Sequence, residues 1–178
     1  REGPQKAVES VRKARMGEQE PEEPEDKIGP ETDALLCLEQ MDAEAAVAYE
    51  VAAASMGDEE IAQMLRNFAK DHRQHVSDIR RLLAELGGEL SLASADPETA
   101  TFAMMAEALS ELGPSASLRA MVASEQFTNS VYETALELIT QPAARSVLER
   151  NFGDELRHLK TLLRLLGRSE CGEQRQSA

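Results

Sequence analysis

Two parts of this chain repeat each other at a spacing of 83 residues (residue 125 minus residue 42). The repeat matches acid with acid, tyrosine with tyrosine and histidine with histidine. The matched pairs are Asp42 with Glu125, Tyr49 with Tyr132, Glu50 with Glu133, Asp71 with Asp154, and His75 with His158. The chain has only two tyrosines and three histidines, so chance does not readily produce this pattern. We infer that the chain folds as two similar units.

Each unit is predicted to be a pair of helices, because apolar residues recur at helical spacing and no alternating run indicates a strand. The expected helices span about residues 33–56, 58–86, 96–112, 115–140 and 142–166. Asp58 is the expected N-cap of the second, and glycines at 57, 87–88, 113 and 167 are expected to end helices. Short connections within each pair and a long one between the pairs are typical of ferritin-like bundles.

The predicted fold class is therefore all-α: a four-helix bundle of two helical hairpins, joined by a long crossover that contains a short extra helix. This bundle should occupy residues 32–167. Residues 1–31 include the run EQEPEEPED, which has no apolar positions, and are expected to form a disordered acidic, proline-rich tail. Residues 168–178 are expected to be a polar C-terminal tail.

The net charge of −14 disfavours nucleic acid and anionic membranes as partners, because both present phosphate. No apolar stretch approaches the roughly 18–20 residues that span a bilayer. The first residues show no apolar core of a secretion signal. The two cysteines, Cys37 and Cys171, have no metal-type spacing and fit reduced thiols. These features together predict a cytoplasmic protein.

Helix geometry gives the repeat a chemical meaning. Residues seven apart lie on one stripe of a helix, so Asp42 and Tyr49 should point the same way. The segment Glu155-Leu-Arg-His158 places a carboxylate and an imidazole one turn apart on one face. Two such pairs, with one acid from each remaining helix, can enclose two metal ions.

On these residues the chain resembles the ferritin-like superfamily, which includes the di-iron carboxylate proteins bacterioferritin and rubrerythrin and many bacterial relatives. The similar stretches are MDAEAAVAYE, DHRQH, SEQFTNSVYE and DELRH, spread over residues 33–167. The last stretch is the most typical of the family. The resemblance implies a metal site inside the bundle, holding iron as a pair or a single ion, or alternatively manganese or zinc.

Carried over position by position, the resemblance implies the following metal ligands: Asp42, His75, Glu125, Glu155 and His158. His72 occupies the remaining ligand position and is the sixth candidate. It implies that Asp71 and Asp154 each orient a histidine of the neighbouring hairpin. Tyr49 and Tyr132 are expected to be core residues that hydrogen-bond an inward acid, rather than redox tyrosines. If the site is catalytic, Glu125, Glu155 and His158 would hold the reactive metal, and Asp42 and His75 its partner.

Two positions depart from the family pattern. Asp42 stands where the family usually has Glu, and His72 stands where a bridging Glu is expected. A neutral imidazole at His72 lowers the ligand charge from about −4 to about −3 beside two divalent ions. Three alternatives stay open: an asymmetric metal pair, one metal that favours imidazole such as zinc, and an abandoned site.

Surface roles are the competing interpretation. Asp154 and Glu155 could pair with Arg157 or Arg150 at the surface, and His72 and His75 could be polar residues of an exposed face.

The predicted function is that of a metal-binding, ferritin-like protein of bacterial oxidative stress or iron handling, an oxidoreductase if bound Fe(II) reacts with O₂ or peroxide. Metal ions, and O₂ or peroxide, are the expected partners, with a homo-oligomer possible. The alternative is a non-catalytic helical interaction module in which a degenerate metal site survives as a structural network.

Overall fold

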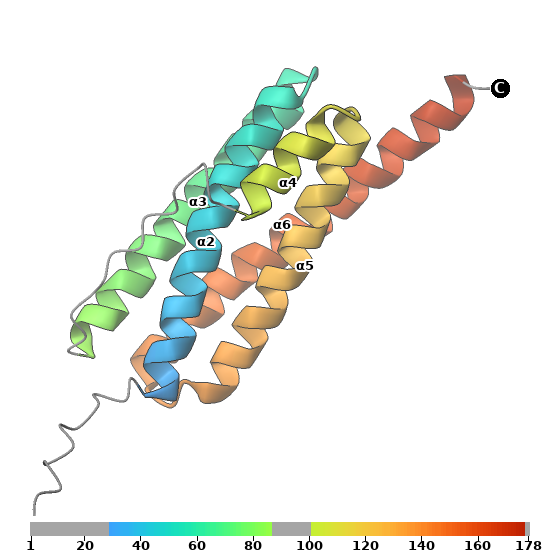
Figure 1. Cartoon of the computed structure of the whole chain (residues 1–178). Coiled ribbons are helices and arrows are strands. Elements are labelled where there is room, and N and C mark those ends of the chain that lie inside the picture. The colour runs from blue at the N-terminus through green and yellow to red at the C-terminus, as the bar shows by residue number, and fades with distance from the viewer. Residues whose placement is uncertain (1–28, 87–100, 177–178) are drawn as a thin grey trace, which may run out of the picture.

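The computed structural model describes residues 29–86 and 101–176, and within these ranges every regular element is an α-helix. Four long helices, α2 (Pro30–Ser55), α3 (Glu59–Glu85), α5 (Pro114–Leu138) and α6 (Pro142–Gln176), lie lengthwise beside one another (Figure 1). The short α4 (Thr101–Ser110) packs on α2 and α5. The prediction of an all-α fold is confirmed.

The helices begin and end for identifiable reasons. Pro30 and Pro114 occupy the first turns of α2 and α5, where a missing N–H costs no hydrogen bond. Asp58 caps α3 as predicted, because its carboxylate accepts bonds from the backbone amides of Glu60 and Ile61 at 2.9 and 3.2 Å. Gly113 adopts a φ of 98°, a value that L side chains rarely tolerate, and thereby turns α4 into α5.

Two predicted boundaries are wrong. Helix α2 begins at Pro30 instead of residue 33, and Glu31 on its first turn accepts hydrogen bonds from the backbone N–H and the hydroxyl of Thr140 at 2.8 and 2.6 Å. Helix α6 continues through Gly167 to Gln176. One glycine costs a helix only about 1 kcal/mol relative to alanine, and no proline follows to stop it.

Other predictions fall on residues outside the described ranges. These are the structure of residues 1–28, the stop at residues 87–88, and the start of the short helix at 96–100.

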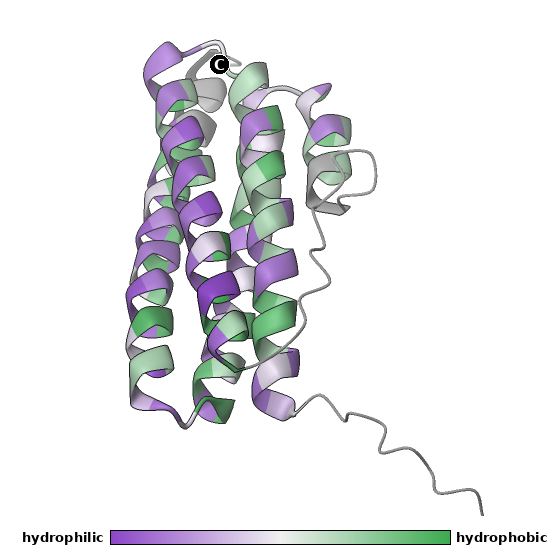
Figure 2. Ribbon diagram, turned by 90° about the vertical axis from the view of Figure 1, so that its left-hand side faces the viewer, coloured by the Kyte–Doolittle hydropathy of each residue, from purple (hydrophilic) through white to green (hydrophobic). Residues whose placement is uncertain are grey.

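Neighbouring helices are α2 with α3, α2 with α5, and α5 with α6, whereas α3 and α6 approach each other closely at only a few points. Among the described residues, α2 and α6 make no close backbone approach, nor do α3 and α5. Each of these two pairs is therefore diagonal. Both hydrophilic and hydrophobic residues run along every long helix (Figure 2), as expected for helices with one buried face.

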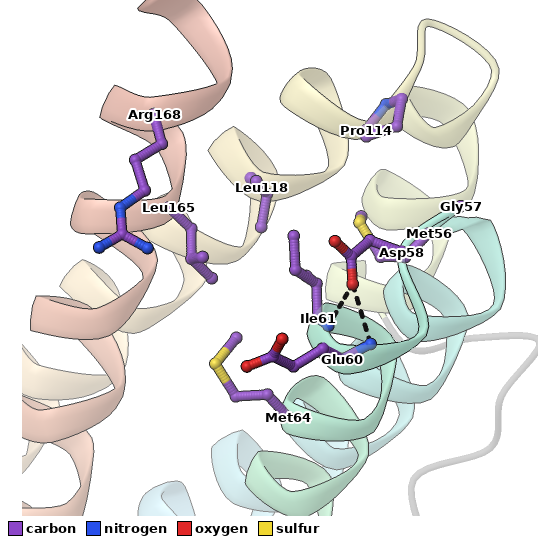
Figure 3. A pocket seen from close by; sticks show the side chains of 10 residues that line it. All are labelled: Met56, Gly57, Asp58, Glu60, Ile61, Met64, Pro114, Leu118, Leu165 and Arg168. Carbon is purple, nitrogen blue, oxygen red and sulfur yellow. Dashed lines mark hydrogen bonds between the residues drawn. The ribbon is translucent and has the colours of Figure 1, made fainter. Parts of the chain in front are cut away.

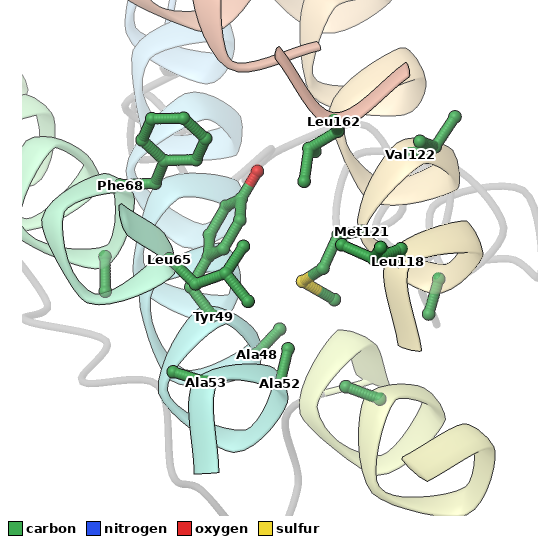
Figure 4. Packing of buried hydrophobic residues seen from close by; sticks show 13 residues of the cluster. Ala48, Tyr49, Ala52, Ala53, Leu65, Phe68, Leu118, Met121, Val122 and Leu162 are labelled. Atoms are coloured by element: carbon green, nitrogen blue, oxygen red, sulfur yellow. The ribbon is translucent and has the colours of Figure 1, made fainter. Parts of the chain in front are cut away.

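Two apolar clusters fill the interior, and each contains one tyrosine of the repeat. Tyr49 lies in the cluster that includes Leu65, Phe68 and Met121 (Figure 4), and Tyr132 lies in the other. Both tyrosines are fully buried. The layer of polar side chains described next is therefore enclosed by apolar packing.

None of the described helices is long and apolar enough to span a membrane.

Candidate metal centre

Six buried side chains from all four long helices meet between the two apolar clusters. Asp42 comes from α2, His72 and His75 from α3, Glu125 from α5, and Glu155 and His158 from α6. None of the six is more than 2% exposed. These are the six residues that the sequence placed at the site, and the interpretation of His72, His75 and Glu155 as surface residues is wrong.

The six side chains form two overlapping donor groups. The first group holds Asp42, His72, His75 and Glu155, and the second holds His72, Glu125, Glu155 and His158. In each group one donor atom per residue lies within 4.8 Å of the others. Carboxylate oxygen and imidazole nitrogen are ligands for iron, manganese or zinc. The arrangement could hold one or two divalent ions.

The donor spacing in the first group fits a bound cation. His72 Nδ1 lies 2.8 Å from Asp42 Oδ1 and 3.3 Å from Glu155 Oε1. His75 Nδ1 lies 3.4 Å from Asp42 Oδ1 and 2.8 Å from Glu155 Oε1. Ligands bound at about 2.0–2.1 Å lie roughly 2.9–3.4 Å apart in square or tetrahedral geometry. The four atoms thus stand close to the separations that an ion would impose.

The second group is slightly more open. His72 Nε2 lies 3.3 Å from Glu125 Oε1, and His158 Nδ1 lies 3.5 Å from the same oxygen. These two separations lie at or just beyond the upper end of the range that a bound ion would impose.

Five ligand atoms at this site have no hydrogen-bond partner, although buried polar atoms are normally paired. They are both carboxylate oxygens of Glu155, Glu125 Oε2, His75 Nδ1 and His158 Nδ1. His75 Nδ1 approaches Glu155 Oε1 to 2.8 Å without hydrogen-bond geometry. A cation would satisfy atoms of this kind, because it accepts electron pairs from all of them at once.

The predicted orienting residues lie next to the histidines. His158 Nε2 lies 3.0 Å from Asp71 Oδ2, and His75 Nε2 lies 3.4 Å from Asp154 Oδ2. Each aspartate thus contacts the histidine of the other hairpin and leaves the Nδ1 atom of that histidine directed to the centre. Outward contacts of this type fix the tautomer and the orientation of a metal-binding imidazole.

Arg157 links these two aspartates, donating to Asp154 on its own helix and to Asp71 on α3, the latter at 3.0 Å. The surface pairing of Asp154 with an arginine is therefore real, but it coexists with the contact to His75. Arg157 spans α3 and α6, the least closely packed of the neighbouring pairs of long helices.

The two tyrosines contact the ligand acids of the opposite hairpin. Tyr49 donates a hydrogen bond to Glu125 Oε1, and Tyr132 donates one to Asp42 Oδ2 at 2.7 Å. Burial and the neighbouring carboxylate charges raise the pKa of both phenols. Both tyrosines therefore keep their protons at neutral pH and act as hydrogen-bond donors.

Electrostatics within the metal-free cluster divide the acids into two kinds. Burial opposes ionisation of Glu125, but hydrogen bonds from His158 and His72 outweigh it and lower the pKa of Glu125 to about 2. The pKa of Asp42 is also lowered against burial, by His72 and His75. Burial, reinforced by the charges of Glu125 and Asp42, raises the pKa of Glu155 well above its ordinary value.

The neighbouring acids raise the pKa values of two histidines in the cluster. Burial alone would lower the pKa of His72, yet Glu155, Asp42 and Glu125 raise it well above 6.5. The pKa of His75 is raised by Asp42 and Asp154, again against burial. Without metal, the cluster thus retains protons at neutral pH that a cation would replace.

Sequence reasoning missed two kinds of residue around the site. The ring of Phe68 stacks on His158 with centroids 4.0 Å apart, and Phe68 lies four positions before His72, on the same face of α3. This helical spacing to His72 was the sequence signal that could have identified Phe68. Asn151 is buried on α6 beside Tyr132, but its repeat mate is Phe68, so the repeat gave no indication of it.

A separate cavity of about 610 Å³ lies near the turn between α2 and α3 (Figure 3). Its walls are mainly apolar and include Met64, Leu118 and Leu165, with Arg168 at one side. None of the six candidate ligands lines this cavity, so the cavity and the candidate metal centre are separate places in the molecule.

Comparison with known proteins found no matching family model, no similar curated protein and no similar solved structure. The case for a metal site therefore rests on the residues of this chain and on their geometry.

Proposed function

We propose that this chain is a ferritin-like four-helix bundle that binds divalent metal through Asp42, His72, His75, Glu125, Glu155 and His158. The observation that carries the proposal is the set of unpartnered atoms on Glu155, Glu125, His75 and His158. Three carboxylates buried within one cluster repel one another unless cations or protons compensate them. Bound metal would supply that compensation.

The proposed role is iron handling, or O₂- or peroxide-linked oxidation in a cytoplasmic stress response, with manganese or zinc as alternative metals. Iron bound at this site would supply electron transfer to O₂ or peroxide. The protein residues would hold the cation, exclude bulk water and keep the tyrosine protons directed at Glu125 and Asp42. Asp71 and Asp154 would hold the histidine rings in their binding orientation.

A metal-free interaction module is the second candidate function. The hydrogen bonds of Tyr49 to Glu125, Tyr132 to Asp42 and His72 to Asp42 favour it, because they satisfy part of the cluster without any ion. Such a network could survive as a structural remnant of a former site.

Metal analysis separates the two candidates. Protein produced in cells and purified without chelator should contain stoichiometric metal, which the variant Glu155→Gln should lack. Glu137→Gln, a change at an exposed position of α5, is the matched control and should retain the wild-type metal content. Wild-type protein that stays metal-free after anaerobic loading with Fe(II), Mn(II) or Zn(II) would refute metal binding and leave the structural network.

A further inference from the structure

The ring of His72 faces the two donor groups with different nitrogen atoms. Nδ1 lies 2.8 Å from Asp42 and 3.3 Å from Glu155, both in the first group. Nε2 lies 3.3 Å from Glu125, in the second group. From these contacts, and resting on the proposed metal-binding function, we infer that His72 bridges two metal ions, one bound at each ring nitrogen.

The internal repeat supports a bridge at this position. Only His72 and Glu155 belong to both donor groups, and they are repeat mates, 83 residues apart (155 minus 72). The remaining ligands divide evenly: Asp42 and His75 in the first group, and Glu125 and His158 in the second. The two shared residues thus stand where the two halves of the site meet.

Stacking holds the His72 ring in the orientation that a bridge requires. The ring stacks on Tyr49 with centroids 5.3 Å apart and an interplanar angle of 25°. The hydroxyl of Tyr49 in turn donates to Glu125. Because the His72 side chain is fully buried, its ring cannot rotate into solvent, and both of its nitrogen atoms stay within the cluster.

Charge balance is restored by the same bridge. Three ionised carboxylates and three neutral histidines carry −3, which leaves one positive charge beside two divalent ions. An imidazole that binds metal through both nitrogens has given up its ring N–H proton to water or buffer, and no electrons are transferred. The ligand charge then becomes −4, equal and opposite to two divalent cations.

A bridge through both nitrogens of His72 determines which metals suit the site. With metal–nitrogen bonds of about 2.0–2.1 Å on both sides of the ring, the two ions would lie roughly 6 Å apart. Two-metal sites with direct bridging are closer, at about 3.5–4 Å. A nitrogen bridge suits zinc, copper, iron or nickel better than metals that prefer oxygen ligands. The site is accordingly suited to a pair of such ions.

The decisive experiment loads wild-type protein with Cu(II) alone and with Cu(II) plus Zn(II). Native mass spectrometry should count two ions per chain. Low-temperature electron paramagnetic resonance of the two-copper form should show far fewer than two spins per chain, because the shared ring couples the two unpaired electrons. The copper–zinc form should regain one full spin.

Two variants of His72 test each half of the bridge. In His72→Asn the side-chain amide reaches only the region of Nδ1, and in His72→Gln it reaches only that of Nε2. Neither variant should show spin coupling, and each should lose at least tenfold affinity for one of its two ions. Arg73→Gln, on the exposed face of α3 beside it, is the matched control and should behave as wild type.

The outcomes separate this inference from the proposed function. One ion per chain, or two coppers with two full spins, would overturn the His72 bridge and leave metal binding intact. No bound ion of any kind would overturn both. If the His72 variants fail to fold, the spin count of the wild-type protein still decides the question.

Discussion

Tyr132 on α5 donates a 2.7 Å hydrogen bond to Asp42 on α2, an acid 90 residues earlier in the chain. The repeat mate of this contact runs the other way, from Tyr49 on α2 to Glu125 on α5. Each hairpin thus supplies the proton donor for the ligand acid of the other. The two contacts tie the hairpins together at the level of the candidate metal centre.

Replacing either tyrosine should weaken metal binding. Tyr132→Phe removes the donor to Asp42, and outer contacts of this kind are commonly worth about 10–100-fold in metal affinity. The free energy of unfolding should fall by about 1–3 kcal/mol, because a buried carboxylate loses a hydrogen bond. Competition titration with a chromophoric chelator measures the affinity.

Tyr49→Phe should have a similar effect on metal affinity, because it removes the equivalent donor to Glu125. If both variants bind metal as wild type does, the tyrosines only pack.

The two tyrosine–acid contacts show which features could be predicted from the sequence and which could not. Helical spacing placed Asp42 and Tyr49 on one face of α2, because that relation is local to one helix. It did not identify the partner of either tyrosine. Which acid meets which hydroxyl depends on the axial register between hairpins, which is set by packing of the two apolar clusters and has no local periodicity.

A second limit concerns Arg157. The sequence suggested that this arginine pairs with Asp154, but it gave no sign of the contact to Asp71 on α3. The repeat offered none, since the mate of Arg157 is Gln74. The repeat therefore identified the residues that both halves share, whereas this contact, which one half alone makes, was found only in the structure.

Asp154→Asn should weaken metal binding at one half of the site. Asp154 contacts the Nε2 atom of His75, so the change loosens a ligand of the first donor group and leaves His158 and Asp71 in place. We expect about 10–100-fold lower affinity for one ion only. Isothermal titration should resolve the change, and Asp71→Asn should affect the other ion. An equal loss for both ions would mean that the halves are not separable.

The first turn of α2 should set how far the N-terminus can be shortened. Deleting residues 1–28 should leave the cooperative melt unchanged, because the sequence predicts a tail without apolar anchors there. Deleting residues 1–31 should lower the melting temperature, because Glu31 accepts two hydrogen bonds from Thr140. The variant Glu31→Gln in the full chain isolates the charge. Equal melting temperatures for both deletions would show that this contact is dispensable.

Glu155→Gln should separate metal binding from stability. In the metal-free protein the pKa of Glu155 is raised, and each unit of such a shift costs about 1.4 kcal/mol at pH values above it. The neutral amide avoids that cost, so the metal-free variant should be at least as stable as wild type at pH 8. At 100-fold excess over the dissociation constant, metal should stabilise wild type by about 2.7 kcal/mol and should leave the variant unchanged. Thermal melts with and without Zn(II) provide the comparison.

The pH dependence of stability should reverse when metal binds. His72 and Glu155 have raised pKa values in the folded, metal-free protein, so both retain protons that the unfolded chain loses. Their contribution to stability is fully present below the unfolded values, about 6.5 and 4.3, and is lost as pH rises through the folded values. Glu125 acts oppositely, and its contribution is lost as pH falls towards about 2.

The metal-free protein should therefore be most stable in mildly acidic solution and should lose stability as the pH rises above the unfolded value of His72, about 6.5, through the interval up to pH 8. Metal binding requires the same protons to leave, so metal affinity should rise over that interval. In saturating Zn(II) the melting temperature should increase from pH 6 to pH 8, whereas in chelator it should decrease. Parallel melts at four pH values measure both slopes. If the two slopes have the same sign, the protons held by His72 and Glu155 are not those that the metal displaces.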